Sequence, residues 1–170
     1  MAAAGLAGMD PADRARTSDT LDLQEGRWPV PLLSEAGALE LLAGARRVAV
    51  IGASPDRTRP SHSVMRYLQA HGYECVPVNP MTREVLGVPS FPSLAVAVEA
   101  GGPFDIVDVF RRPEHTPAIA RAAVASGCRA LWLQLGVVSW EAARIAAEGG
   151  LAVVMNRCTA IEHRKLGSGA

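Results

Sequence analysis

Residues 48–63 read VAVIGASPDRTRPSHS, and this stretch decides the fold because it joins a short apolar run to a loop of small residues that leads into a helical segment. The run VAVIG at 48–52 is apolar without alternation, which is typical of a strand buried on both faces. A strand, a short loop and a helix in this order are the beginning of a βαβ unit.

The same alternation of strand and helix continues along the chain. Four further apolar runs of strand length lie at 74–79, 104–110, 129–135 and 151–156. Helical segments between the runs are expected at 62–71, about 93–100, 114–126 and 139–148. Consecutive parallel strands need crossover connections of this kind. The sequence therefore predicts an α/β fold with a doubly wound, five-stranded parallel sheet, in which ligands bind at the carboxyl ends of the strands.

The chain has the length of one domain preceded by an extension. Residues 1–31 are rich in Ala, Gly, Asp and Arg, show no clear periodicity and end in Trp-Pro-Val-Pro, so we expect a flexible N-terminal extension. Residues 32–170 form the predicted domain, which begins with a helix over 35–45 that Ser34 caps.

Composition excludes several classes of partner. Lys plus Arg and Asp plus Glu number 17 each, so no general basic field draws the protein to nucleic acid or to anionic membranes. No apolar run approaches the roughly 18 residues that span a bilayer, and no export signal leads the chain, so we expect a cytoplasmic protein. Cys75, Cys128 and Cys158 are widely spaced and are expected to be reduced thiols.

The loop after the first strand is a candidate phosphate site. Backbone N–H groups at the start of the following helix, with Ser54 and Ser61 nearby, form a cradle for an anion, and Arg57 and Arg59 add cationic donors. The alternative is an ordinary turn in which Ser61 or Ser63 only caps the helix. A dinucleotide fingerprint would read GxGxxG, and this loop keeps only its first glycine, Gly52.

The second and third strands end in groups that suit a nucleotide. Asn79 and Pro80 stand where an NAD-binding protein places a carboxylate, and Asn tolerates a phosphorylated ribose better than a carboxylate does. At the third strand end, Phe110 offers a face for adenine and Arg111 and Arg112 offer donors for phosphate. The alternative is a core Phe followed by two solvated arginines.

The fourth and fifth strands also end in polar residues. Gln134 lies among apolar neighbours, before Leu135 and Gly136, and needs a hydrogen-bond partner if buried. An amide-bearing ligand or a backbone carbonyl would supply one. Asn156 and Arg157 follow the fifth strand. We find no catalytic set and no metal-binding spacing, because the four histidines are scattered: His62, His71, His115 and His163.

Four stretches carry a resemblance to a known family. They are VAVIGASPDRTRPSHSVMRYLQAHGYECVPVNP (48–80), FDIVDVFRRPE (104–114), ALWLQLGV (130–137) and VVMNRCTAIEHRKL (153–166). Together they resemble the small single-domain CoA-binding proteins, whose Rossmann-like fold is similar to the CoA-binding domain of the succinyl-CoA ligase alpha subunit. The resemblance covers about residues 34–166.

The resemblance implies coenzyme A as the ligand and assigns each strand end to a part of it. The phosphates would lie near Gly52, Ala53, Ser54, Arg57 and Ser61. The adenosine would lie toward Asn79, Pro80, Phe110 and Arg111, with Arg112 beside it. The pantetheine arm would run toward Gln134, Leu135 and Gly136, with Asn156 and Arg157 at the rim. The family usually has Asp at position 156, so the Asn here puts an acid–base role at this position in doubt.

These observations leave three functions open. The first is non-catalytic binding of coenzyme A or an acyl-CoA, with a small molecule as the partner and no protein partner identified. The second is an enzyme, either an NAD(P)-binding oxidoreductase-like protein or a detached nucleotide-binding part of an acyl-CoA ligase. An oxidoreductase would need a substrate domain, and too little chain remains to build one. The third is an interaction protein that docks through its N-terminal extension.

Overall fold

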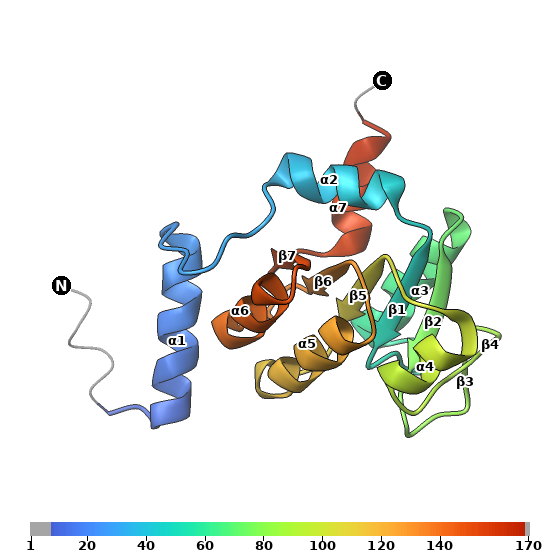
Figure 1. Cartoon of the computed structure of the whole chain (residues 1–170), viewed down its shortest axis with the longest axis horizontal. Coiled ribbons are helices and arrows are strands. Elements are labelled where there is room, and N and C mark those ends of the chain that lie inside the picture. Colours follow the sequence, from blue (N-terminus) through green and yellow to red (C-terminus); the bar gives the residue numbers. More distant parts are fainter. Residues whose placement is uncertain (1–7, 169–170) are drawn as a thin grey trace.

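The computed structural model describes residues 8–168, which fold around one five-stranded parallel sheet (Figure 1). The strands follow one another across the sheet in the order β2-β1-β5-β6-β7, and every neighbouring pair is parallel. Their bounds are Arg47–Ile51 (β1), Glu74–Val78 (β2), Ile106–Val109 (β5), Ala130–Leu133 (β6) and Ala152–Met155 (β7). The predicted doubly wound α/β fold is confirmed, with each strand close to its expected position.

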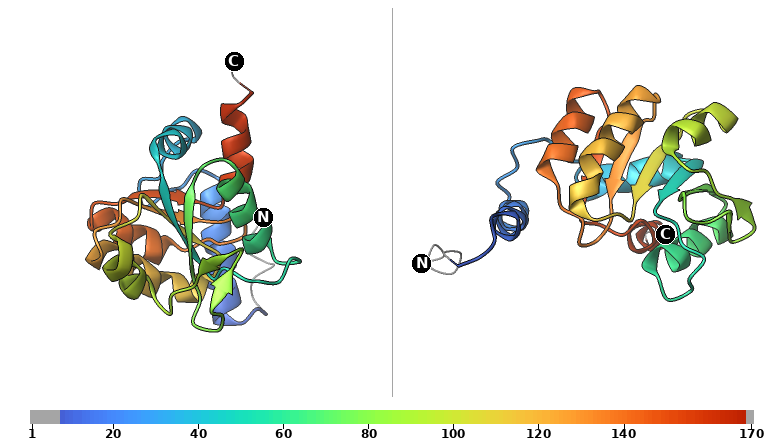
Figure 2. Two further views of the ribbon diagram at one scale, coloured as in Figure 1. Left: turned by 90° about the vertical axis from the view of Figure 1, so that its right-hand side faces the viewer. Right: turned by 90° about the horizontal axis from the view of Figure 1, so that it is seen from below.

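Helices cover both faces of the sheet (Figure 2). Those on one face are α4 (Leu94–Gly101), α5 (Thr116–Ala125) and α6 (Trp140–Glu148). Those on the other face are α2 (Glu35–Gly44), α3 (Pro60–Ala70) and α7 (Thr159–Leu166). A short 3₁₀ turn, η2 (Pro113–His115), precedes α5. Helix α7 was not predicted from the sequence, and η2 and α5 were predicted as one helix over 114–126.

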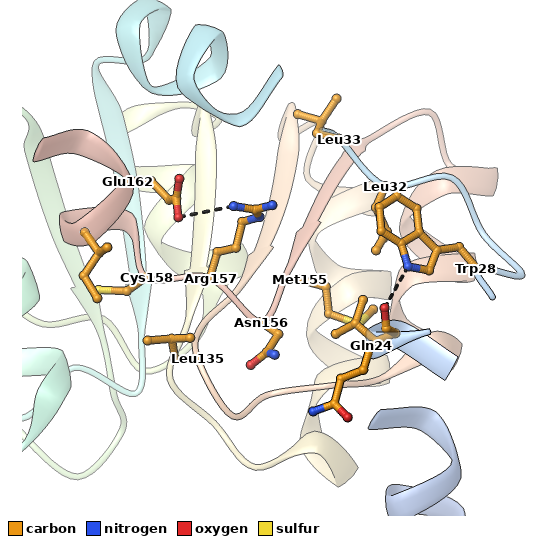
Figure 3. Close-up of a pocket in the computed structure, with 12 residues that line it drawn as sticks. Gln24, Trp28, Leu32, Leu33, Leu135, Met155, Asn156, Arg157, Cys158 and Glu162 are labelled. Carbon is orange, nitrogen blue, oxygen red and sulfur yellow. Dashed lines mark hydrogen bonds and ion pairs between the residues drawn. The ribbon is translucent and has the colours of Figure 1, made fainter. Parts of the chain in front are cut away.

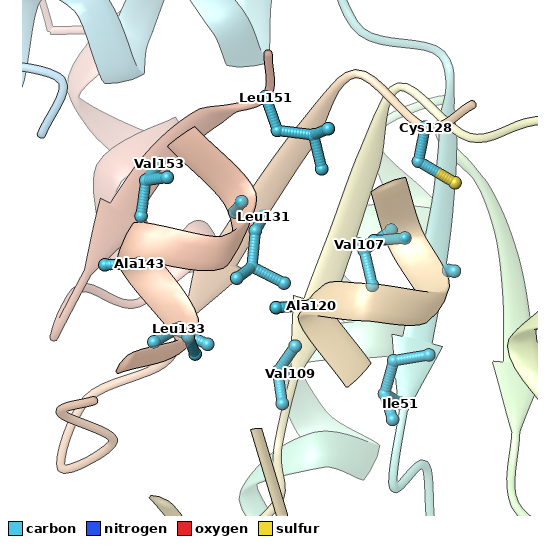
Figure 4. Close-up of a cluster of buried hydrophobic side chains, with 14 of the residues drawn as sticks. Ile51, Val107, Val109, Ala120, Cys128, Leu131, Leu133, Ala143, Leu151 and Val153 are labelled. Atoms are coloured by element: carbon cyan, nitrogen blue, oxygen red, sulfur yellow. The ribbon is translucent and has the colours of Figure 1, made fainter. Parts of the chain in front are cut away.

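Burial on both faces explains the unbroken apolar runs of the sequence. In β1, Ala49 and Ile51 pack under α4, α5 and α6, whereas Val48 and Val50 pack under α2, α3 and α7. Figure 4 shows the first of these two cores, with side chains of the sheet meeting those of α5 and α6. Because successive side chains of a strand point to opposite faces, apolar residues are expected at successive positions of such a strand, not only at alternate ones.

The N-terminal segment differs from the expectation. We expected no regular structure before residue 32, but a helix, α1 (Pro11–Gln24), forms there, and Asp10 caps it by accepting a hydrogen bond from the Ala12 N–H (2.8 Å). The Trp140 indole N–H donates to the Asp19 carbonyl (3.2 Å), which ties α1 to α6. Residues 1–7 of the predicted extension lie outside the described residues, and the domain boundary and the flexibility stay predictions.

The segment after α1 protects an edge of the sheet. The Leu33 N–H donates to the Val153 carbonyl on β7 (2.8 Å), the outermost strand on that side. An unpaired edge strand offers backbone groups to other chains, so this contact shields part of the edge.

Three smaller features complete the fold. A hairpin joins β3 (Glu84–Val85) to β4 (Val88–Pro89) through Leu86 and Gly87, both with positive φ, as a two-residue turn requires. All three cysteines are free thiols. None of the described helices has both the length and the apolarity that crossing a membrane would require.

Candidate functional site

The site lies where the strand order reverses. The chain runs outward from β1 to β2, then crosses back so that β5 lies on the other side of β1. The loops after β1 and β5 therefore meet: a Cβ placed on Gly52 would lie 3.0 Å from the Phe110 carbonyl oxygen and 3.0 Å from Cδ of Arg111. Such a switch point is the usual ligand site of open α/β sheets.

A groove of about 700 Å³ opens at this switch point. We call it the central groove, and it is lined by Gly52, Ser54, Arg59, Pro60, Ser61, Val64, Asn79, Phe110, Arg111, Arg112, Pro113, Gln134, Leu135, Gly136, Val137 and Cys158. These residues come from the segments that follow all five strands of the sheet and from the start of α3. The volume lies within the range of small-molecule sites.

The loop from β1 to α3 is ordered by its own side chains. The N–H and hydroxyl of Thr58 donate to Oδ1 of Asp56 (2.9 and 2.7 Å), and these bonds lower the pKa of the Asp56 carboxyl. Helix α3 then begins at Pro60 with no side-chain cap. Neither Ser61 nor Ser63 caps it, so backbone N–H groups of its first turn remain for other partners.

The central groove is basic although the chain as a whole is neutral. Arg59, Arg111 and Arg112 line it, and the described residues contribute no Asp or Glu to its walls. Arg59 has one carboxylate nearby, Asp56 at 3.9 Å, whereas Arg111 and Arg112 form no ion pair with any described residue. A concave surface with one sign of charge attracts ligands of the opposite sign. The groove is therefore suited to an anion.

Two buried side chains, those of Asp108 and Thr159, hold the side-chain amide of Gln134. Its Nε2 donates to Oδ1 of Asp108 (2.6 Å) and lies 3.0 Å from the Thr159 hydroxyl, which donates in turn to Oδ2 of Asp108 (3.0 Å). The partner of Gln134 is thus a side-chain pair, not the backbone carbonyl that we considered. Every fully buried side-chain polar atom of the described residues has a partner, and no described group bonds to Oε1 of Gln134. This oxygen therefore reaches the groove as an acceptor.

Asp108 is an unusual group at the centre of the sheet. It is fully buried on β5, between Val50 of β1 and Trp132 of β6. Burial raises the pKa of its carboxyl to about 7, although the hydrogen bonds from Gln134 and Thr159 act in the opposite direction. Asp108 was not among the residues predicted for the site. The signal that could have indicated it is a second acidic residue inside an apolar run.

Two asparagines fix the loops around the groove. The Asn79 side chain donates to the Ala53 carbonyl (2.8 Å) and accepts from the Met81 N–H (2.9 Å), so it joins the ends of β1 and β2. Asn156, with φ of 57°, accepts from the Gly136 N–H (2.8 Å). Both amides hold backbone in place, and contact of Asn79 with a ribose phosphate stays a prediction.

Most of the predicted site residues line the central groove. They are Gly52, Ser54, Ser61, Asn79, Phe110, Arg111, Arg112, Gln134, Leu135 and Gly136. Ala53 is fully buried, and Arg57 is exposed and lies outside the groove lining. Arg59, which the sequence already suggested as a cationic donor, lines the groove as well. The structure adds Pro60, Val64, Pro113, Val137 and Cys158, which lie close in sequence to predicted residues.

Two smaller cavities adjoin the central groove. One, about 290 Å³, lies between α4 and α5, includes Arg111 of the groove and has Pro80, Pro92 and Ile119 among its walls. The other, about 350 Å³, shares Leu135 and Cys158 with the groove and extends toward α1 (Figure 3). The three cavities follow one another along the carboxyl edge of the sheet.

Arg157 lies at the second of these cavities and is already paired. Its guanidinium is 3.3 Å from Glu162 and 3.8 Å from Glu35, and Lys165 completes the cluster at 3.0 Å from Glu162. These ion pairs link Arg157 to α2 and α7, and its contact with a ligand stays a prediction. Asn156 lines the same cavity.

The histidines are less scattered than expected. The rings of His71 and His163 lie 5.1 Å apart, and the Tyr67 hydroxyl is 2.9 Å from Nδ1 of His163. Within residues 8–168, no group of three or more His, Cys, Asp or Glu side chains is arranged to hold a metal ion.

Comparison with known proteins gives consistent matches. A family described as "CoA binding domain" matches residues 46–164. The Bacillus subtilis (strain 168) "Uncharacterized protein YneT" is 40% identical over 130 residues, which cover 76% of this chain and 94% of that protein.

Solved structures share the fold. A hypothetical protein from Pyrococcus horikoshii OT3 superimposes with a TM-score of 0.74 at 36% identity, over 79% of this chain and 92% of its own. The apo form of the dinucleotide-forming acetyl-coenzyme A synthetase 1 of Ca. Korarchaeum cryptofilum gives a TM-score of 0.60 at 20% identity, over 69% of this chain and 28% of that one. The latter likeness is one of fold.

Proposed function

This chain belongs to the CoA binding domain family, and from that premise we propose that it binds coenzyme A or an acyl-CoA along the carboxyl edge of its sheet, without catalysing a reaction on it. Coenzyme A has an adenine ring at one end, phosphates next to it and a long uncharged pantetheine arm. The proposal therefore requires three regions in order along the site: an apolar region for the adenine, a basic region for the phosphates and a region that binds the amides of pantetheine.

The single observation that carries the proposal is the order of the three adjoining cavities. The cavity between α4 and α5 has apolar walls and suits adenine. Arg111 stands between it and the central groove, whose three arginines suit the phosphates. Oε1 of Gln134 lies farther along and suits an amide N–H of pantetheine. The order of these properties matches the order of the chemical groups in the ligand.

The alternatives have less support. A free ribose diol of NAD is usually bound by a carboxylate at the end of the second strand, where this chain has Asn79 with its amide already bonded to backbone. A detached ligase part would need a reacting side chain in the groove, and the histidines lie outside its lining. We further propose a small-molecule ligand as the main partner and a cytoplasmic location, in keeping with three free thiols.

Coenzyme A should raise the melting temperature of the protein and NAD should not. A ligand at 100 times its dissociation constant stabilises the folded state by about 2.7 kcal/mol, which corresponds to roughly 5–10 °C for a chain of this size. Differential scanning fluorimetry with each ligand measures both shifts. Equal shifts for the two ligands would favour a dinucleotide site instead.

Replacement of Arg111 should weaken binding of coenzyme A without unfolding the protein. Its guanidinium lies at the junction of two cavities and has no ion pair among the described residues, so Arg111→Ala removes a contact that only the ligand uses. We expect a five- to thirty-fold higher dissociation constant by calorimetry, the usual range for a partly exposed charged contact. Arg66→Ala is the matched control, because Arg66 is exposed on α3 and does not line the groove. Equal affinity of both variants would place the phosphates elsewhere.

A further inference from the structure

The cavity next to α1 is built mainly from apolar side chains of three separate segments. We call this 350 Å³ cavity the side chamber. Leu23, Trp28, Leu32 and Leu33 come from the N-terminal segment, Leu135 from the loop after β6, and Met155, Cys158 and Ile161 from β7 and α7. Figure 3 shows that the labelled side chains of these segments surround one space. The N-terminal segment, which family resemblance did not cover, supplies one whole side of it.

Several apolar side chains in the walls of the side chamber are exposed to solvent and are not buried in the core. Among the described residues, six large hydrophobic side chains are exposed, and three of them line this chamber: Trp28 (47%), Leu135 (56%) and Ile161 (44%). Convergence of exposed apolar groups on one hollow indicates a binding surface, whereas scattered ones need no explanation.

The charged groups of the side chamber are mutually neutralised. Arg157 pairs with Glu162 and Glu35, and Glu162 also pairs with Lys165. The Trp28 indole N–H is bonded to the Leu23 carbonyl (3.1 Å). Among the described residues, therefore, no unpaired cation is left in the chamber to bind a carboxylate, and the free surface of the chamber suits an uncharged aliphatic group.

The side chamber continues the central groove at the end that suits pantetheine. Leu135 and Cys158 line both spaces, and Leu135 follows Gln134 directly. A ligand whose amide meets Gln134 would carry its thiol end to Leu135 and Cys158. Any group attached to that thiol would then enter the chamber.

We propose that the side chamber binds the acyl group of an acyl-CoA, and that the preferred ligand carries an uncharged aliphatic acyl chain of short to medium length. This inference rests on the proposed function, because it takes the direction of coenzyme A in the groove from it. The size of the chamber, at the lower end of the range for ligand sites, limits the chain length.

A ligand series tests the inference on the unmodified protein. Each CH₂ group transferred from water to an apolar site raises affinity about fourfold, so butanoyl-CoA should bind roughly fifteenfold more tightly than acetyl-CoA. Succinyl-CoA has the same number of acyl carbons as butanoyl-CoA but ends in a carboxylate. It should gain nothing over acetyl-CoA. Isothermal titration calorimetry with coenzyme A and these three thioesters gives all four dissociation constants.

A pair of matched variants locates the effect. Ile161 is the third residue of α7 and lines the chamber, whereas Val96 is the third residue of α4, is exposed to a similar extent (40%) and lines neither the chamber nor the groove. Glutamate is favourable in the first turn of a helix, so both Ile161→Glu and Val96→Glu should fold. Ile161→Glu should cut the advantage of butanoyl-CoA to less than threefold and leave the affinity for coenzyme A unchanged. Val96→Glu should keep the full advantage.

The outcomes separate this inference from the function on which it rests. If coenzyme A binds and the acetyl and butanoyl thioesters bind equally well, the acyl group lies in solvent and the side chamber is not its site. A full butanoyl advantage in Ile161→Glu contradicts the inference in the same way. If neither coenzyme A nor any thioester binds, the proposed function itself fails. Should Ile161→Glu not fold, the ligand series with the wild-type protein decides alone.

Discussion

Between about pH 4 and pH 8, the wild-type protein should lose about 4 kcal/mol of stability relative to its Asp108→Asn variant. The cause is the carboxyl of Asp108, fully buried at the centre of the sheet, where burial raises its pKa to about 7. In the unfolded chain the same carboxyl has a pKa of about 3.9. The native and unfolded states therefore bind different numbers of protons between these two values.

The sign of the effect follows from which state holds the proton. Below about pH 4 both states are protonated, and the contribution of Asp108 to stability is fully present. As the pH rises toward 7, the unfolded state releases its proton while the native state keeps it, so the free energy of unfolding falls by about 1.4 kcal/mol per pH unit. Above pH 7 both states are ionised and the loss is complete. Asn cannot ionise, so the variant lacks this loss.

Asp105 provides a control of opposite sign near the start of the same strand. Burial raises the pKa of its carboxyl, but hydrogen bonds from the N–H groups of Arg47 and Arg46 (3.0 and 2.9 Å) outweigh burial and leave the pKa lowered. Asp105→Asn should therefore remove stability that the wild-type protein has at neutral pH and loses in acid. Urea unfolding of the three proteins across the pH range measures both effects. Parallel curves for the wild type and Asp108→Asn would show that Asp108 titrates normally in the native state.

The comparison of these two acids shows why part of the site was not predictable. Both lie in the run FDIVDVF, three residues apart, and sequence pattern treats them alike. Strand pairing separates them. Asp108 is paired between Val50 and Trp132, whereas Asp105 lies outside β5 and accepts from the N–H groups of Arg46 and Arg47 at the start of β1. The partners of Asp108 are distant in sequence, at Gln134 and Thr159. No local pattern contains that information.

The elements that were predicted well from the sequence are those whose residues form runs of buried apolar side chains. Five continuous apolar runs predicted five parallel strands, and the carboxyl ends of those strands gave most of the groove. Helix α1 was missed because it has no buried residue and so shows no apolar stripe. Arg57 and Arg59 lie two residues apart in one loop, and only Arg59, directly before α3, lines the groove. The path of the loop decides which of the two side chains reaches the groove, and the sequence does not reveal that path.

Gly52→Ala should destabilise the protein by about 2–5 kcal/mol, the second large effect that the structure predicts. Two costs combine at this position. Gly52 has φ of 83°, a conformation that costs an L-residue roughly 1–2 kcal/mol. A Cβ there would also approach the Phe110 carbonyl oxygen and the Arg111 side chain to 3.0 Å, and crowding of this kind costs about 1–3 kcal/mol. The loops after β1 and β5 would have to separate to relieve it.

A substitution at Gly72 distinguishes the conformational cost from the cost of crowding. Gly72 has φ of 89°, but within residues 8–168 no atom beyond its two chain neighbours lies within 4 Å of a Cβ placed on it. Gly72 precedes β2 and so lies at the amino ends of the strands, whereas the groove lies at their carboxyl ends. Gly72→Ala should therefore cost only the conformational part, roughly 1–2 kcal/mol by urea unfolding, and should leave coenzyme A binding unchanged. Gly52→Ala should lose more stability and should also bind coenzyme A more weakly, because relief of the contact moves Arg111. Equal losses of stability with unchanged affinity in both variants would mean that the contact between the two loops does not set the position of Arg111. The switch point would then tolerate a side chain between its two halves, and the close approach of the β1 and β5 loops would not be what shapes the groove.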